Sequence, residues 1–176
     1  NTLAAVKKRF GKSVVALQLP IGEQASFRGV VDLVHMRALI ESEDTAALTE
    51  EDIPTDLAGR AAELREAVVE AAAEANDELM MKYLEEGELT DEEIFSGLQE
   101  AIRSGRIFPV LTGAAFRNFG TLPLLDLLAN DTPSPDQMPV THAIKSEQEF
   151  ELSANSAGPL VAYAFKTTAD PFAGRI

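Results

Sequence analysis

The chain has 176 residues, 45% of them hydrophobic, and its 29 Asp and Glu outnumber its 15 Lys and Arg, which gives a formal net charge of −14. This composition supports a sizeable core in one domain, or in one domain and part of a second. The negative charge disfavours direct, nonspecific nucleic-acid binding, and the lack of cysteine excludes disulfides and thiolate metal sites. No apolar run of about 18 residues occurs and the first residues open no signal peptide, so we expect no membrane partner and a cytoplasmic location.

The first forty residues predict a helix followed by strands. Residues 2–10 carry apolar side chains at helical spacing, and Gly11 ends the predicted helix. Residues 13–19 are rich in β-branched side chains and predict a strand that is closed by Pro20 and Gly22. Residues 25–40 alternate well enough to predict one or two further strands.

Three features of this region concern function. Gly29 is predicted to be a bulge or a close backbone contact within its strand. The acidic stretch 41–56 contains a proline and is predicted to be a loop. His35 and His142 are far apart in the sequence and form no recognisable ligand set, so we predict no metal site.

The middle of the chain predicts long helices. Residues 56–86 form the longest helical pattern, with Thr55 as a possible N-cap and a bend or restart near Asn76. A capping box of Thr90 and Glu93 opens a further helix, which we expect to run to about residue 103. The carboxylates of this box therefore have a local structural role.

Two stripes follow the longest helical pattern. An apolar stripe is predicted to be buried and consists of Leu57, Ala61, Leu64, Val68, Ala72, Ala75 and Leu79. An acidic stripe consists of Glu63, Glu66, Glu70 and Glu74. Like charges four residues apart cost about 0.2–0.5 kcal/mol each on an exposed helix, so stability alone does not explain them. The acidic stripe indicates either a docking surface for a basic partner or a solvated helix face.

Residues 107–128 predict a strand, a loop of small residues and an apolar helix. In α/β domains such loops follow the carboxyl end of a strand, where ligands gather, and Gly and Ala let a ligand approach the main chain. The loop is therefore either a ligand-binding edge or a plain strand-to-helix turn. After it, three prolines in residues 131–139 predict a stiff connector and a domain boundary. Residues 158–176 predict a strand, a turn near Asp170 and the start of another strand.

Several stretches together resemble bacterial elongation factor G. Residues 113–118 (GAAFRN), Gly120 and the segment Pro133-Ser134-Pro135 resemble the end of its GTPase domain, and residues 20–38 (PIGEQASFRGVVDLVHMRA) resemble the segment leading into its inserted subdomain. The resemblance implies an α/β fold with an α+β insert, forming the end of a P-loop GTPase-type domain.

The resemblance also implies a division of the chain. Residues 1–130 would belong to the GTPase domain, with the inserted helix-and-strand subdomain at about 20–106. Residues 131–157 would form a proline-rich linker. Residues 158–176 would begin a β-barrel second domain that the chain does not complete.

The resemblance assigns two candidate sites. The fifth guanine-nucleotide motif, whose backbone N–H groups donate to the guanine O6, would consist of Gly113, Ala114, Ala115 and Phe116. Ala115 matches the alanine of the motif, whereas Ala114 replaces the usual serine. Docking to the carboxyl-terminal domain of the ribosomal stalk protein would use the acidic stripe, Glu63, Glu66, Glu70 and Glu74.

The implied activity belongs to a longer parent protein. That parent would bind GTP and Mg²⁺ and hydrolyse GTP on the ribosome to drive translocation. The phosphate-binding, catalytic and base-reading motifs of the family are absent from these residues, so we predict no catalytic residue, no bound cofactor and no hydrolysis by the chain alone. An alternative is a non-catalytic acidic interaction module. Ala114 and the short acidic loop suggest a paralogue, and termination factors and ribosomal protection proteins generally lack the insert.

Overall fold

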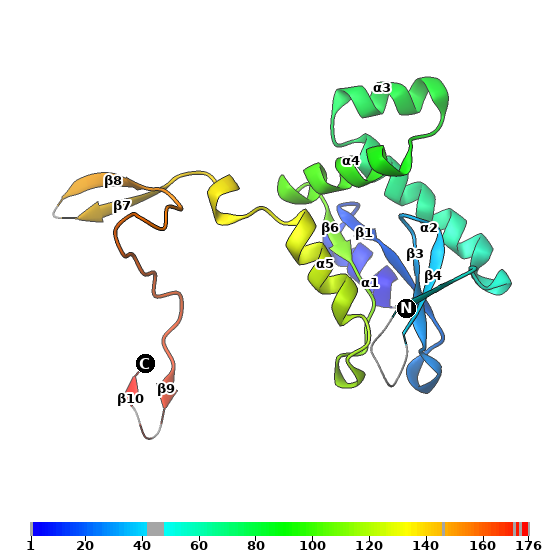
Figure 1. The fold of residues 1–176 in the computed structure, drawn as a ribbon, viewed down its shortest axis with the longest axis horizontal. Helices are drawn as coiled ribbons and strands as arrows, with labels where there is room; N and C mark the ends of the chain where they lie inside the picture. Colours follow the sequence, from blue (N-terminus) through cyan, green and yellow to red (C-terminus); the bar gives the residue numbers. More distant parts are fainter. Residues whose placement is uncertain (1, 42–47, 146, 171, 173, 176) are drawn as a thin grey trace. The chain divides into compact units, whose positions relative to one another are not determined.

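The computed structural model describes residues 2–41, 48–145, 147–170, 172 and 174–175 (Figure 1). The chain divides into two compact units, Asn1–Thr132 and Pro133–Ile176. No described helix combines the length and apolar character needed to cross a membrane.

A parallel pair of strands lies at the centre of the first unit (Figure 1). Helix α1 (Thr2–Phe10) precedes β1 (Val14–Ala16), which runs parallel to β6 (Phe108–Val110) with Val15 opposite Pro109. Gly11 has φ +80° and its N–H donates to the Lys7 carbonyl at 2.8 Å, so the predicted glycine stop is confirmed. All three residues of β1 are buried.

The predicted strand at 13–19 is divided between two sheets. Leu17 lies at the crossing, because its N–H donates to the Val110 carbonyl at 3.0 Å while its own carbonyl accepts from the Leu33 N–H at 3.1 Å. Beyond it, β2 (Gln18–Ile21) joins an antiparallel sheet. Of the two residues predicted to close the strand, Pro20 lies inside β2, whereas Gly22 directly follows its last residue. β2 is an edge strand, where proline is tolerated because its missing N–H faces away from the ladder.

The antiparallel sheet has the order β2-β3-β4-β5, with β3 at Gly29–Asp32, β4 at Arg37–Glu41 and β5 at Leu48–Glu51. A short 3₁₀ turn at Gln24–Ser26 precedes β3. The close contact predicted at Gly29 is confirmed, since a Cβ there would lie 2.4 Å from the Leu39 carbonyl oxygen. The loop predicted for 41–56 was wrong at β5, a charged edge strand that pairs with β4. Residues 42–47 lie outside the described residues.

Three helices follow the sheet: α2 (Thr55–Ala73), α3 (Asp77–Glu86) and α4 (Asp91–Arg103). The restart predicted near Asn76 is confirmed, because the Asn76 side chain caps α3 by accepting from the Leu79 N–H at 3.0 Å. The Thr90–Glu93 capping box is also present. Thr55 is not an N-cap. It is the first helical residue, and the preceding Pro54 occupies the cap position without a side-chain hydrogen bond.

The main core lies between the strands, α2 and α4. The predicted apolar stripe of α2 is confirmed, with Ala61, Leu64, Val68, Ala72 and Ala75 buried and Leu57 and Leu79 packed against them. Gly97 lets α4 approach closely, since a Cβ there would lie 2.4 Å from the Ala72 carbonyl oxygen. Helix α5 (Thr121–Asp131) packs against α4 and ends the unit.

The second unit contains two small hairpins. After a 3₁₀ turn (Pro135–Gln137), β7 (Thr141–Lys145) pairs with β8 (Gln148–Leu152), a hairpin that the sequence did not predict. β9 (Ala169–Asp170) pairs with β10 (Gly174–Arg175), so Asp170 lies in a strand instead of a turn. The strand predicted from residue 158 is not formed, because no described segment pairs with residues 159–168. The assignment of the two units to the predicted domains stays a prediction.

Candidate functional site

The loop after β6 is closed at its base. Ala114 and Phe119 exchange two backbone hydrogen bonds, of 3.0 and 3.2 Å, around a short 3₁₀ turn (Ala115–Arg117). A Cβ on Gly113 would lie 2.7 Å from the Phe119 carbonyl oxygen, and Gly120 has φ +81°. Glycine is therefore required at both ends of the loop, and the turn between them projects from the end of the strand.

The turn presents backbone donors. Among the described residues, none accepts a hydrogen bond from the N–H of Gly113, Ala115 or Phe116, whereas the Ala114 N–H is committed to Phe119. The Phe116 side chain is fully exposed. Of the four residues predicted to form the guanine motif, three can therefore donate to a ligand through the main chain.

Two contacts fasten this loop to the antiparallel sheet. Arg117 donates through Nη1 to the Phe27 carbonyl at 3.0 Å and lies over the Phe119 ring, 4.3 Å from its centroid. The Phe27 and Phe119 rings meet edge to face at 6.0 Å in a small buried cluster. At the other end, the Gln18 Oε1 accepts from the Thr112 N–H at 3.0 Å.

Sequence reasoning missed these anchoring roles. Gln18 is the buried polar residue in an otherwise apolar strand, and that signal could have identified it. Arg117 was seen only as part of a polar corner. Its contact with Phe27 joins residues 90 positions apart, which no local pattern reveals.

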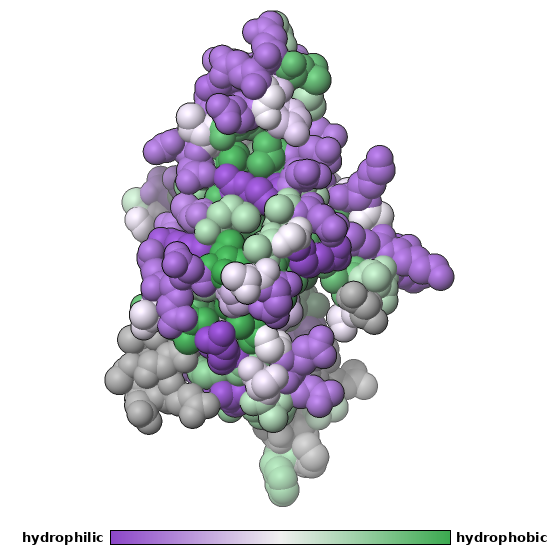
Figure 2. Space-filling model, turned by 90° about the vertical axis from the view of Figure 1, so that its right-hand side faces the viewer, coloured by the Kyte–Doolittle hydropathy of each residue, from purple (hydrophilic) through white to green (hydrophobic). Residues whose placement is uncertain are grey.

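The acidic stripe of Glu63, Glu66, Glu70 and Glu74 lies exposed on one face of α2. Figure 2 shows the side of the molecule on which α2 lies, and that side is mainly hydrophilic, with apolar patches between. The four glutamate side chains of the acidic stripe differ in the cations that lie near them.

Internal cations compensate part of the acidic stripe. Glu63 pairs with Arg60 at 2.6 Å, and Glu70 and Glu74 share a hollow with Lys7 and Lys12. Glu66 makes no ion pair within the described chain. The structure thus brings the predicted docking residues together, while their role stays a prediction.

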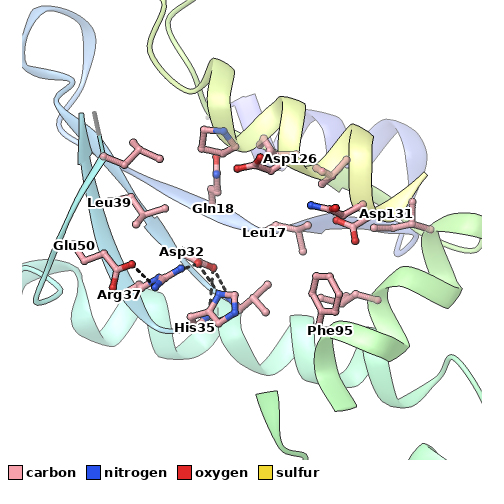
Figure 3. A pocket seen from close by; sticks show the side chains of 18 residues that line it. Leu17, Gln18, Asp32, His35, Arg37, Leu39, Glu50, Phe95, Asp126 and Asp131 are labelled. Carbon is pink, nitrogen blue, oxygen red and sulfur yellow. Dashed lines mark hydrogen bonds and ion pairs between the residues drawn. The ribbon is translucent and has the colours of Figure 1, made fainter. Parts of the chain in front are cut away.

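A further cleft opens between the antiparallel sheet and helices α4 and α5, with a volume of about 300 Å³ (Figure 3). We call it the sheet–helix cleft. On its sheet wall, His35 Nδ1 lies 2.8 Å from Asp32 Oδ2, and Arg37 Nη1 lies 2.5 Å from Glu50 Oε1. No sequence-based prediction included this cleft.

The helix wall of the sheet–helix cleft carries Phe95, Asp126 and Asp131 (Figure 3). Burial raises the pKa of Asp131, against the opposing effects of a hydrogen bond from Gln99 and the nearby Arg103. Within the described parts of the chain, no three His, Asp or Glu side chains gather to hold a metal ion.

Comparison with known proteins supports the fold class. No protein-family model matches the chain. The structure is similar to the crystal structure of a Thermus thermophilus protein, with 27% sequence identity over 98% of this chain and a TM-score of 0.70. The chain spans 23% of the length of that protein, whose description names no function. The predicted α/β class is therefore confirmed, and the finer assignments are proposals.

Proposed function

We propose that this chain is part of a translational GTPase similar to elongation factor G, which binds and hydrolyses GTP on the ribosome to drive translocation. In this proposal Asn1–Thr132 forms the end of a P-loop GTPase-type domain with its inserted subdomain, and Pro133–Ile176 begins a β-barrel domain. The observation that carries the proposal is the loop of Gly113, Ala115 and Phe116, with unpaired N–H groups beyond the carboxyl end of a parallel strand.

The donor set of this loop suits guanine. Guanine presents a carbonyl oxygen, O6, where adenine presents an amino group, so a cluster of main-chain N–H donors favours guanine. Ala114 lacks the hydroxyl of the usual serine, but its N–H already bonds to Phe119, and the neighbouring donors do not depend on its side chain. In the complete protein, GTP supplies the phosphoanhydride that is cleaved, and this loop would hold the base.

The anchors of the loop fix the position of these donors. Gln18 holds its first residues through Thr112, and Arg117 holds its last residues through Phe27. Donors that are already positioned lose little conformational freedom when they bind a ligand, which favours affinity. The antiparallel sheet thus acts as a support for the proposed base-binding loop.

Ala115→Pro tests the loop by removing one N–H donor. Proline suits the first position of a helical turn, and Ala114 before it has φ −127° and ψ 86°, outside the α region that a following proline disfavours. We expect GDP to bind the complete protein about 3- to 10-fold more weakly, the effect of losing one hydrogen bond.

Phe116→Ala is the matched control, because it removes an exposed side chain and keeps the N–H. It should leave GDP affinity unchanged. Equal affinity in wild type and Ala115→Pro would refute the assignment of the base-binding loop.

The acidic stripe supports a second part of the proposal, docking of the carboxyl-terminal domain of the ribosomal stalk protein. Chemical-shift mapping at low salt should show perturbations along α2. Glu66→Gln should weaken binding more than Glu78→Gln on α3, an exposed glutamate outside the stripe with the same charge change. Absence of perturbations on α2 would refute the docking surface.

A non-catalytic acidic interaction module is the alternative, and the exposed stripe favours it as much as it favours the GTPase. GTP hydrolysis by the complete protein, with and without ribosomes, separates the two functions. We expect strong stimulation by ribosomes. No hydrolysis in either condition would reject the GTPase and leave the interaction module.

A further inference from the structure

The sheet–helix cleft is lined by a glutamine whose side-chain N–H groups have no acceptor among the described residues. Gln18 is 9% exposed and lies between Leu39 and Asp126 in Figure 3. Its Oε1 accepts from the Thr112 N–H, which fixes the orientation of the amide. Thr112 does not line this cleft, so the amide turns its oxygen away and its Nε2 towards the cleft. Within the described chain no group accepts from Nε2, which a ligand oxygen could therefore satisfy.

A second donor lies on the sheet wall. The Arg37 Nε is buried and makes no hydrogen bond among the described residues, while Asp32 Oδ2 is 3.5 Å away. The same guanidinium is held by Glu50 through Nη1. The guanidinium on the sheet side of the cleft is thus held in place by Asp32 and Glu50.

The cleft as a whole is negative and has an apolar floor. Four carboxylates line it, from Asp32, Glu50, Asp126 and Asp131, against the single guanidinium of Arg37. Asp126 makes no hydrogen bond or ion pair within the described chain. The floor is formed by Leu17, Val34, Leu98, Leu111 and Leu127. A bound cation would reduce the repulsion between the carboxylates and the burial cost that raises the Asp131 pKa.

We propose that the sheet–helix cleft binds an organic cation, an alkyl guanidinium or ammonium whose chain also carries a carbonyl or hydroxyl oxygen. The cation lies against Asp126 and Asp131, the alkyl chain packs on the leucine floor, and the oxygen accepts from Gln18 Nε2. A volume of about 300 Å³ is at the lower end of small-molecule sites and suits a ligand of this size. An arginine residue with blocked ends has this chemistry, both as a free molecule and within a peptide.

NMR titration of the 176-residue chain tests the proposal with three probes. N-acetyl-arginine methylamide carries the cation, the chain and the oxygen; butylguanidine has the same single charge but lacks the oxygen; N-acetyl-norleucine methylamide lacks the cation. We expect saturable shifts of the Gln18 side-chain amide and of α5 amides with the first probe. Butylguanidine should bind about 3- to 10-fold more weakly, the effect of one hydrogen bond, and the norleucine probe should not saturate.

Asp126→Asn removes one negative charge from an exposed position of α5, so the fold should persist. It should weaken binding of the arginine probe about tenfold, as expected for a charge-assisted contact. Asp52→Asn is the matched control, an exposed aspartate in the same unit and outside the cleft, and it should leave the affinity unchanged.

The outcomes separate the site from general electrostatic attraction. Equal weakening by both substitutions, or no saturable shift of the Gln18 amide, would overturn the proposal, and equal binding of butylguanidine would overturn the role of Gln18. An acetylated Gly-Arg-Gly amide then distinguishes the two sources of the cation. If this peptide binds as tightly as N-acetyl-arginine methylamide, the natural ligand is an arginine within a peptide. If the peptide does not bind, the natural ligand is a free small molecule. GTP is absent from every arm, so the proposed GTPase function does not affect the result.

Discussion

Helices α2 and α4 each contain a glycine, and the two glycines have opposite surroundings. A Cβ on Gly59 of α2 would meet nothing within 4 Å, whereas a Cβ on Gly97 of α4 would lie 2.4 Å from the Ala72 carbonyl oxygen and 3.0 Å from Leu79 Cδ1. Replacing each with alanine therefore tests the packing of α4 on α2. That packing places the acidic stripe of α2 and the α4 wall of the sheet–helix cleft.

The expected magnitudes follow from these distances. Alanine in a helix interior is favoured over glycine by about 0.5–1 kcal/mol, so Gly59→Ala should stabilise the protein by about that amount. Gly97→Ala has the same gain in helix propensity, but the added methyl group forces the backbones of α4 and α2 apart. Such overpacking costs about 1–3 kcal/mol. With a 2.4 Å approach to main-chain oxygen we take the upper end, about 3 kcal/mol, for a net loss of about 2–2.5 kcal/mol.

Urea unfolding followed by far-UV circular dichroism measures both variants. With a slope of about 1–3 kcal/mol per molar urea, the midpoints of the two variants should differ by about 1 M or more. Equal stabilisation by both substitutions would refute the close helix contact. An unchanged slope is the control for an unaltered unfolded state.

Three further substitutions test individual charges and contacts. The Lys82 ammonium holds the pKa of Glu93 below 4.5, so in urea unfolding the wild type should lose more stability than Glu93→Gln as the pH falls through 4.5. Burial raises the pKa of Asp131 above 3.8, so the ionised carboxylate opposes folding. In thermal unfolding near pH 7, Asp131→Asn should therefore be more stable than the wild type. A stability difference that does not shrink as the pH falls to 3.8 would contradict this. Arg117→Gln should cost about 1–2 kcal/mol and speed amide exchange in the loop, whereas unchanged exchange would show that its bond to the Phe27 carbonyl is not an anchor.

The sequence predicts elements whose signals are local. Gly11 and the Thr90–Glu93 capping box act within a few residues of themselves, and the structure has both. β5 and the β7–β8 hairpin escaped prediction because a short edge strand is defined by its partner and not by its own composition. The strand predicted from residue 158 failed for the same reason, since it found no partner among the described segments.

The candidate sites follow the same division. The small-residue loop and the acidic stripe are continuous or periodic in sequence, so both could be named before the structure was known. The anchors of the loop could not, because Gln18 and Thr112 are 94 positions apart. The sheet–helix cleft draws on all four strands of the antiparallel sheet, a turn and two helices, and no single stretch of sequence identifies it.

The two backbone hydrogen bonds of Leu17 affect how force passes between the two sheets. One residue donates to the parallel pair and accepts from the antiparallel sheet, with no flexible segment between β1 and β2. A force applied to the antiparallel sheet therefore reaches β6 through hydrogen bonds on a single residue, while Gln18 carries the same force to the loop after β6. The antiparallel sheet and the strand pair therefore move together as one stiff unit, joined at Leu17, whose N–H and carbonyl are both hydrogen-bonded.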